Sequence, residues 1–115
     1  MEFYYHDVDE DVLVISADGG LNRQTSSQFT DDVLQLIETG VTKILIDCQH
    51  LTYISSYGLA VLLRMHKRAA KAGGQVSMAN VHGAVADLLN LTRLNRVFHI
   101  YPDTERALLD FRTKT

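Results

Sequence analysis

Residues 43–63 read KILIDCQHLTYISSYGLAVLL, and this stretch decides the fold. It opens with a short apolar run that ends at Asp47. A run of this length, rich in β-branched residues and closed by an acid, predicts a strand buried on both faces. A second apolar run, residues 59–63, follows Ser55 and Ser56. Serines in that place are typical of a helix start, because a hydroxyl can accept a hydrogen bond from the free N–H groups of the first turn.

Gly58 falls in the first turn of this predicted helix. A glycine there costs about 1 kcal/mol relative to alanine, so its presence beside two hydroxyls indicates that another group approaches the backbone closely. Two interpretations of Ser55 and Ser56 follow. In the first, both serines only cap the helix. In the second, one hydroxyl accepts a regulatory phosphate, which would face the helix N–H groups and change the charge of a corner that a partner covers.

Strand and helix patterns alternate through the rest of the chain. Short apolar or alternating runs predict five strands, at residues 2–6, 11–16, 44–47, 75–79 and 97–101. The first two strands are joined by an acidic turn and form a β-hairpin. After the hairpin, strands and helices alternate, which implies right-handed crossovers and a mostly parallel sheet.

Four helices are predicted, each with an apolar face that points toward the core. The first ends near Gly40, the second at Gly73, the third covers residues 80–91, and the last is capped by Asp103. The predicted inward residues of the four helices, in chain order, are Phe29, Val33, Leu36 and Ile37; Leu59, Leu62, Leu63 and His66; Val85, Leu88 and Leu89; and Ala107, Leu108 and Phe111.

Composition limits the classes of function. The chain has 115 residues, of which 46% are apolar and 22% charged, as in one soluble globular domain. Its net charge of −3 argues against nucleic acid or an anionic membrane as the main partner. No run approaches the ~20 apolar residues of a membrane span, and the acidic start lacks a basic leader. The single cysteine, Cys48, cannot form an internal disulfide. We therefore expect a cytoplasmic protein without direct membrane insertion.

The sequence contains no recognisable motif of a catalytic site. The five histidines are scattered, without the spacing of a metal site, and the glycine-rich nucleotide motifs are missing. We therefore expect no catalytic residue, no metal and no cofactor. Asp47 ends a predicted strand, where open α/β sheets bind ligands, so a ligand-binding or small enzyme domain with its site there remains an alternative. A lone acid at such a place is more often a cap or turn former.

Four segments carry a family resemblance. They are residues 45–59 with LID and LTYISSYGL, residues 72–76 with AGGQV, residues 85–94 with VADLLNLTRL, and residues 98–108 with FHIYPDTERAL. In this order they cover nearly the whole chain. The chain thereby resembles the STAS-domain family and, more narrowly, the bacterial anti-sigma factor antagonists.

The resemblance implies both a fold and a function. The fold is a single compact STAS-like α/β domain over residues 1–115, with a mixed, mostly parallel sheet of about five strands and four helices packed largely on one face. Such proteins are not enzymes. They bind an anti-sigma factor that is also a serine kinase, and so release a sigma factor for transcription. Phosphorylation of a serine at the start of the helix after the central strand breaks this complex, and a metal-dependent serine phosphatase reverses the switch.

Carried over to this sequence, the phosphorylation site falls on Ser56 and the partner-binding residues on Asn22, Ser55, Ser56, Tyr57 and Gly58. The family usually has an acid where this chain has Ser55, a second acid at Asn22, and a small hydroxyl residue at Tyr57. The absence of both acids removes negative charge near Ser56. We therefore expect the kinase to recognise this site differently or not to phosphorylate it. The alternative is a non-phosphorylated STAS adaptor or scaffold subunit, stressosome-like or a companion of a lipid-transport complex.

Overall fold

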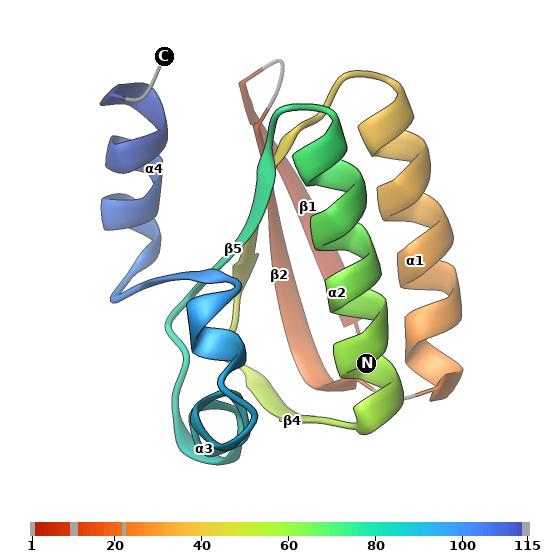
Figure 1. The fold of residues 1–115 in the computed structure, drawn as a ribbon, viewed down its shortest axis with the longest axis vertical. Helices are drawn as coiled ribbons and strands as arrows, with labels where there is room; N and C mark the ends of the chain where they lie inside the picture. The colour runs from red at the N-terminus through yellow and green to blue at the C-terminus, as the bar shows by residue number, and fades with distance from the viewer. Residues whose placement is uncertain (1, 10–11, 22, 114–115) are drawn as a thin grey trace.

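The protein forms one layered α/β unit, seen here in a computed structural model that describes residues 2–9, 12–21 and 23–113 (Figure 1). The elements follow in the order β1 (Glu2–Asp9), β2 (Val12–Leu21), α1 (Arg23–Glu38), β3 (Lys43–Asp47), β4 (Leu51–Ile54), α2 (Ser56–Lys71), β5 (Gln75–Ala79), α3 (Gly83–Leu91), the 3-10 turn η1 (Leu94–Arg96), β6 (His99–Tyr101) and α4 (Thr104–Thr113).

The sheet has the strand order β1-β2-β3-β5-β6, and β4 pairs with the end of β2. The β1–β2 hairpin is antiparallel, whereas the other strand pairs are parallel. In the middle of the sheet, Ile46 of β3 lies between Ile15 of β2 and Met78 of β5. The prediction of a mixed, mostly parallel sheet entered through a hairpin is confirmed.

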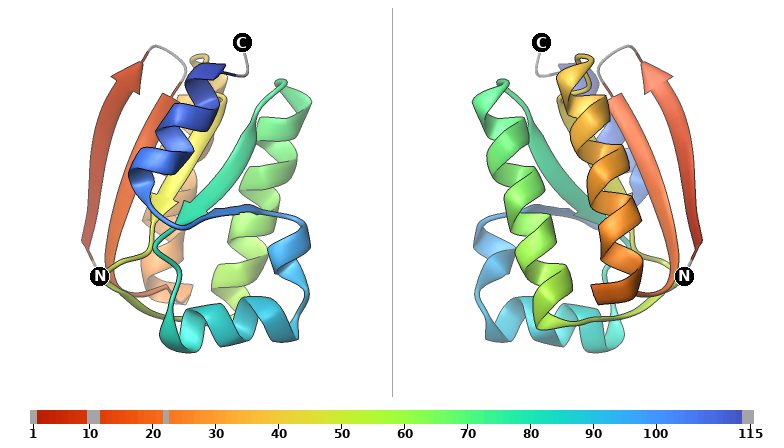
Figure 2. Two further views of the ribbon diagram at one scale, coloured as in Figure 1. Left: turned by 90° about the vertical axis from the view of Figure 1, so that its left-hand side faces the viewer. Right: turned by 90° about the vertical axis from the view of Figure 1, so that its right-hand side faces the viewer.

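Both faces of the sheet are covered, but unequally (Figures 1 and 2). Residues from α1, α2 and α3 build the large core on one face, and α4 alone covers a smaller core on the other. In β3, Ile44 and Ile46 belong to the large core and Leu45 to the small one. The central strand is therefore buried on both faces, as its apolar run predicts, and the helices pack largely on one face.

β2 extends further than the sequence predicts, because two glycines let another strand approach. It continues through Gly19 and Gly20 to Leu21, and these residues pair with β4. An ideal Cβ on Gly20 would lie 1.9 Å from Cε1 of Tyr53, so only glycine leaves room for that ring. The Thr52 hydroxyl also donates to the Gly19 carbonyl at 2.9 Å. Residues 51–54, which are not among the predicted strands, thus form a strand.

The predicted inward residues of all four helices are buried or partly buried, and α2 also buries residues that were not predicted. Phe29, Val33, Ile37, Val85, Leu89, Ala107 and Phe111 are buried, and Leu36, Leu88 and Leu108 are partly buried. In α2, Leu59 and Leu62 are buried, but Leu63 and His66 only partly. Met65 and Ala69 are buried as well. The helix packs against α1 as well as against the sheet.

Candidate functional site

The start of α2 is built by Ser55, the residue that links β4 to the helix. Its backbone is extended (φ −78°, ψ 169°), and its Oγ accepts a hydrogen bond from the Gly58 N–H at 3.1 Å. Its carbonyl accepts from the Leu59 N–H at 2.9 Å. This is the geometry of an N-cap, which satisfies one of the free N–H groups of the first turn. The capping interpretation thus holds for Ser55.

Ser56 is differently placed, although it is the next residue. It is the first residue of α2 and is exposed to solvent, whereas Ser55 is half-buried. Among the described residues, the Ser56 hydroxyl has no hydrogen-bond partner. Tyr57 is 40% exposed, and Gly58 is buried. One turn thus brings together four of the five residues that the sequence singles out, with one serine engaged in capping and the other facing solvent.

The fifth residue, Asn22, lies outside the described residues. The structure does place the element that follows it, because α1 begins at Arg23. The N-terminal ends of α1 and α2 lie at the same end of the helix layer (Figure 1).

An exposed aromatic residue that the sequence analysis missed lies in β4. Tyr53 is 45% exposed, and its ring lies over Gly20. Tyr53 and Tyr57 precede and follow Ser56 in the sequence, and both are exposed. The first turn of α2 contains no acid. The apolar, β-prone LTYI run and the Gly19-Gly20 pair were the signals that could have identified this strand and its ring.

Asp47 joins three elements at the carboxyl end of β3. Its Oδ1 accepts from Asn80 Nδ2 at 2.9 Å and from the Gln49 N–H at 3.1 Å. Asn80 Nδ2 also lies 3.5 Å from the Thr104 hydroxyl at the start of α4. Asn80 adopts a left-handed backbone (φ 58°), which asparagine tolerates better than most residues. Asp47 therefore forms a turn after β3 and, through Asn80, links the end of β3 to the start of α4. Lone acids at strand ends usually have such a structural role.

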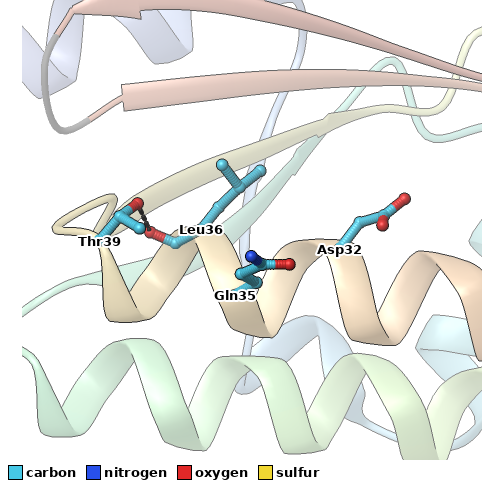
Figure 3. A pocket seen from close by; sticks show the side chains of 4 residues that line it. All are labelled: Asp32, Gln35, Leu36 and Thr39. Carbon is cyan, nitrogen blue, oxygen red and sulfur yellow. Dashed lines mark hydrogen bonds between the residues drawn. The ribbon is translucent and has the colours of Figure 1, made fainter.

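Two of the open clefts in the described part of the chain have linings that do not include the first turn of α2. One, of about 430 Å³, is lined by Asp18, His50, His82 and the first turn of α3, and His82 Nε2 lies 2.8 Å from the Gln49 carbonyl oxygen. The other, of about 380 Å³, is lined by Asp32, Gln35 and Leu36 of α1 and by Thr39, which directly follows the helix (Figure 3). In it the Thr39 hydroxyl donates to the Leu36 carbonyl at 2.7 Å.

Cys48 is fully buried in the large core. Burial, with a further contribution from the charge of Asp47, raises the pKa of its thiol far above the usual range. The thiol thus behaves as a small apolar group. In the described part of the chain, no three His, Cys, Asp or Glu side chains are arranged to hold a metal ion. Within the same ranges, no helix has the length and apolar character to cross a bilayer.

Comparison with known proteins places this geometry in a family. The Anti-sigma F factor antagonist of Paenibacillus polymyxa is 26% identical over 100 residues, which cover 86% of this chain and 86% of that protein. The structure of the anti-sigma factor antagonist SpoIIAA in its unphosphorylated form superposes with a TM-score of 0.88 at 19% identity, and covers 99% of both chains.

An anti-sigma factor antagonist from Mycobacterium paratuberculosis has the same fold, with a TM-score of 0.84 at 22% identity over 96% of this chain and 93% of that one. At these identities the two solved structures establish the fold, which agrees with the layers described above. The family model of the STAS domain matches residues 6–107. Since that match covers most of the sequence, the chain belongs to the STAS domain family.

Proposed function

We propose that this STAS domain is an anti-sigma factor antagonist, a binding protein rather than an enzyme. Its partner is a serine-kinase anti-sigma factor, which docks on the start of α2, and phosphorylation of Ser56 weakens the complex. The observation that supports this proposal most directly is that two adjacent serines differ in their hydrogen bonding and exposure. Ser55 is engaged as the helix cap, whereas the Ser56 hydroxyl is exposed and has no partner among the described residues.

A phosphate on Ser56 suits the local structure. It would lie at the positive end of α2, beside free N–H groups, so that the helix tolerates it. It would also add nearly two negative charges beside Tyr57, which is exposed, and three residues after the exposed Tyr53. A partner packed on those rings would have to desolvate that charge, and binding would weaken. A metal-dependent serine phosphatase would then restore binding.

The names of the relatives support this role, since that of the Paenibacillus polymyxa protein is Anti-sigma F factor antagonist. The sequence at the site differs from the family pattern in lacking two acids, at Asn22 and Ser55. We therefore expect a kinase whose site is matched to a less acidic surface.

The test is a pull-down from the source cells with the tagged protein, followed by identification and purification of the captured kinase. With ATP, the kinase should phosphorylate the wild-type protein and Ser27→Ala, which removes another exposed serine, but not Ser56→Ala. Phosphate on Ser56→Ala at the wild-type level would reject Ser56 as the acceptor.

The missing acids also favour a second candidate, a STAS adaptor or scaffold subunit that is not phosphorylated. This alternative predicts a different result in the same pull-down. Scaffold or transport subunits would be recovered, a kinase would not, and Ser55 and Ser56 would be ordinary residues of a helix start.

A further inference from the structure

The outer face of α2 carries a charge opposite to that of the whole chain. The net charge of the protein is −3, yet residues 56–71 contain four basic residues and no acidic one. All four, Arg64, Lys67, Arg68 and Lys71, are exposed. The helix therefore places a basic surface on an acidic protein.

Helix electrostatics accounts for only half of these charges. Arg68 and Lys71 lie in the last turn, where cations are stabilised by the helix dipole. Arg68 also pairs with Glu38 of α1, with 3.4 Å between Nη2 and Oε1. Arg64 and Lys67 precede the last turn, and neither has an ionic partner among the described residues. Because the effect of the helix dipole fades within one turn, neither the dipole nor an ion pair explains the positions of Arg64 and Lys67.

Arg64 and Lys67 continue the face that begins at Ser56. The exposed residues Ser56, Tyr57, Ala60, Arg64 and Lys67 follow helical spacing along one side of α2, and we call them the α2 stripe. At 1.5 Å per residue the stripe is about 17 Å long. Ala60 lies in its middle and keeps the surface low, so that another protein can approach the helix closely between the aromatic end and the basic end.

We infer that the α2 stripe docks an acidic segment of the kinase partner, an inference that rests on the proposed function. Charge complementarity selects such a partner, and the aromatic end supplies apolar contact. A phosphate on Ser56 then acts by direct repulsion, since it brings negative charge to a surface that binds negative charge. Nucleic acid fits less well, because a duplex would also cover the neighbouring α1, which carries Asp31, Asp32 and Glu38, whereas a short acidic segment can lie along the stripe alone.

The experiment compares two double charge reversals by isothermal calorimetry with the kinase captured by the wild-type protein. Arg64→Glu/Lys67→Glu alters the stripe, and Arg96→Glu/Arg106→Glu makes the same change in net charge at exposed positions in η1 and α4. The first variant should bind about tenfold or more weakly, and the control within about twofold of the wild type. Raising NaCl from about 0.05 M to about 0.5 M should weaken the wild-type complex more than that of the stripe variant. Circular dichroism checks that both variants fold.

Each contrary outcome has a separate meaning. Equal affinity of the stripe variant and the wild type would overturn the docking stripe and leave the antagonist role intact. Failure of the wild-type protein to bind any kinase would overturn both. Binding of the wild-type protein to mixed-sequence DNA, lost in the stripe variant, would overturn the assignment of the stripe to an acidic protein.

Discussion

At the residue scale, the difference between Ser55 and Ser56 can be tested by adding charge to the exposed serine. Ser56→Asp places a carboxylate where the phosphate would lie and should weaken kinase binding about tenfold, whereas Ser56→Ala should bind like the wild type. Gln35→Glu, on the exposed face of α1 near its C-terminal end, adds the same charge as a control. The measurement is a titration of each variant with the kinase. Equal affinity of Ser56→Asp and the wild type would contradict the charge switch.

The contact between Gly20 and Tyr53 gives a second prediction at this scale. Gly20→Ala would bring a Cβ to 1.9 Å from the Tyr53 ring, so the ring must move away. Because the Tyr53 side chain is 45% exposed and can swing outward, we expect a change in the NMR signals of the ring and a loss of at most about 1 kcal/mol in the free energy of unfolding, measured with urea. In a Tyr53→Ala background the same substitution should cost almost nothing. If Gly20→Ala lowered the free energy of unfolding equally in both backgrounds, the Tyr53 ring would not be the reason why glycine is needed at position 20.

At the element scale, α2 depends on its cap. Ser55→Ala removes the oxygen that accepts from the Gly58 N–H and should lower the free energy of unfolding by about 1 kcal/mol. Ser55→Asp keeps an acceptor and restores the acid that the family usually has at this position. It should therefore retain the stability but lower the rate of Ser56 phosphorylation, because the expected kinase is matched to a less acidic surface. Urea unfolding and a kinase assay measure the two effects, and a loss of stability in Ser55→Asp equal to that in Ser55→Ala would argue against the cap.

The elements also show how far the sequence alone can predict this fold. β3 and the start of α2 were predictable because an uninterrupted apolar run and a serine cap are local signals. β4 was missed because it has four residues, of which only Leu51 and Ile54 are buried, and its pairing with β2 is a long-range event. The exposed ring of Tyr53 was missed with it. The burial of Met65 and Ala69 was also missed, although both follow Leu62 at the helical spacing i, i+3 and i+7.

At the scale of the whole molecule, His66 joins parts of the chain that are distant in sequence. It lies on α2, and its Nδ1 accepts a hydrogen bond from the Val76 N–H of β5 at 3.3 Å. Its ring forms a T-shaped pair with that of Phe98, with 5.5 Å between the centroids. Burial, and then the charge of His99, lower the pKa of His66 from the ordinary value of 6.5. A protonated Nδ1 could not accept the Val76 hydrogen bond, so the folded protein favours the neutral ring.

Stability should therefore depend on pH through His66. Below pH 6.5, His66 is protonated in the unfolded chain but still neutral in the folded chain. The contribution of His66 to the free energy of unfolding is therefore constant above pH 6.5 and is lost as the pH drops toward and through the folded pKa of His66. Urea unfolding at several pH values between about 5 and 8 measures this slope. His66→Gln, which cannot titrate, should flatten the profile, whereas His50→Gln, at an exposed position, should leave it unchanged. Parallel profiles for the wild type and His66→Gln would assign the acid sensitivity to another group.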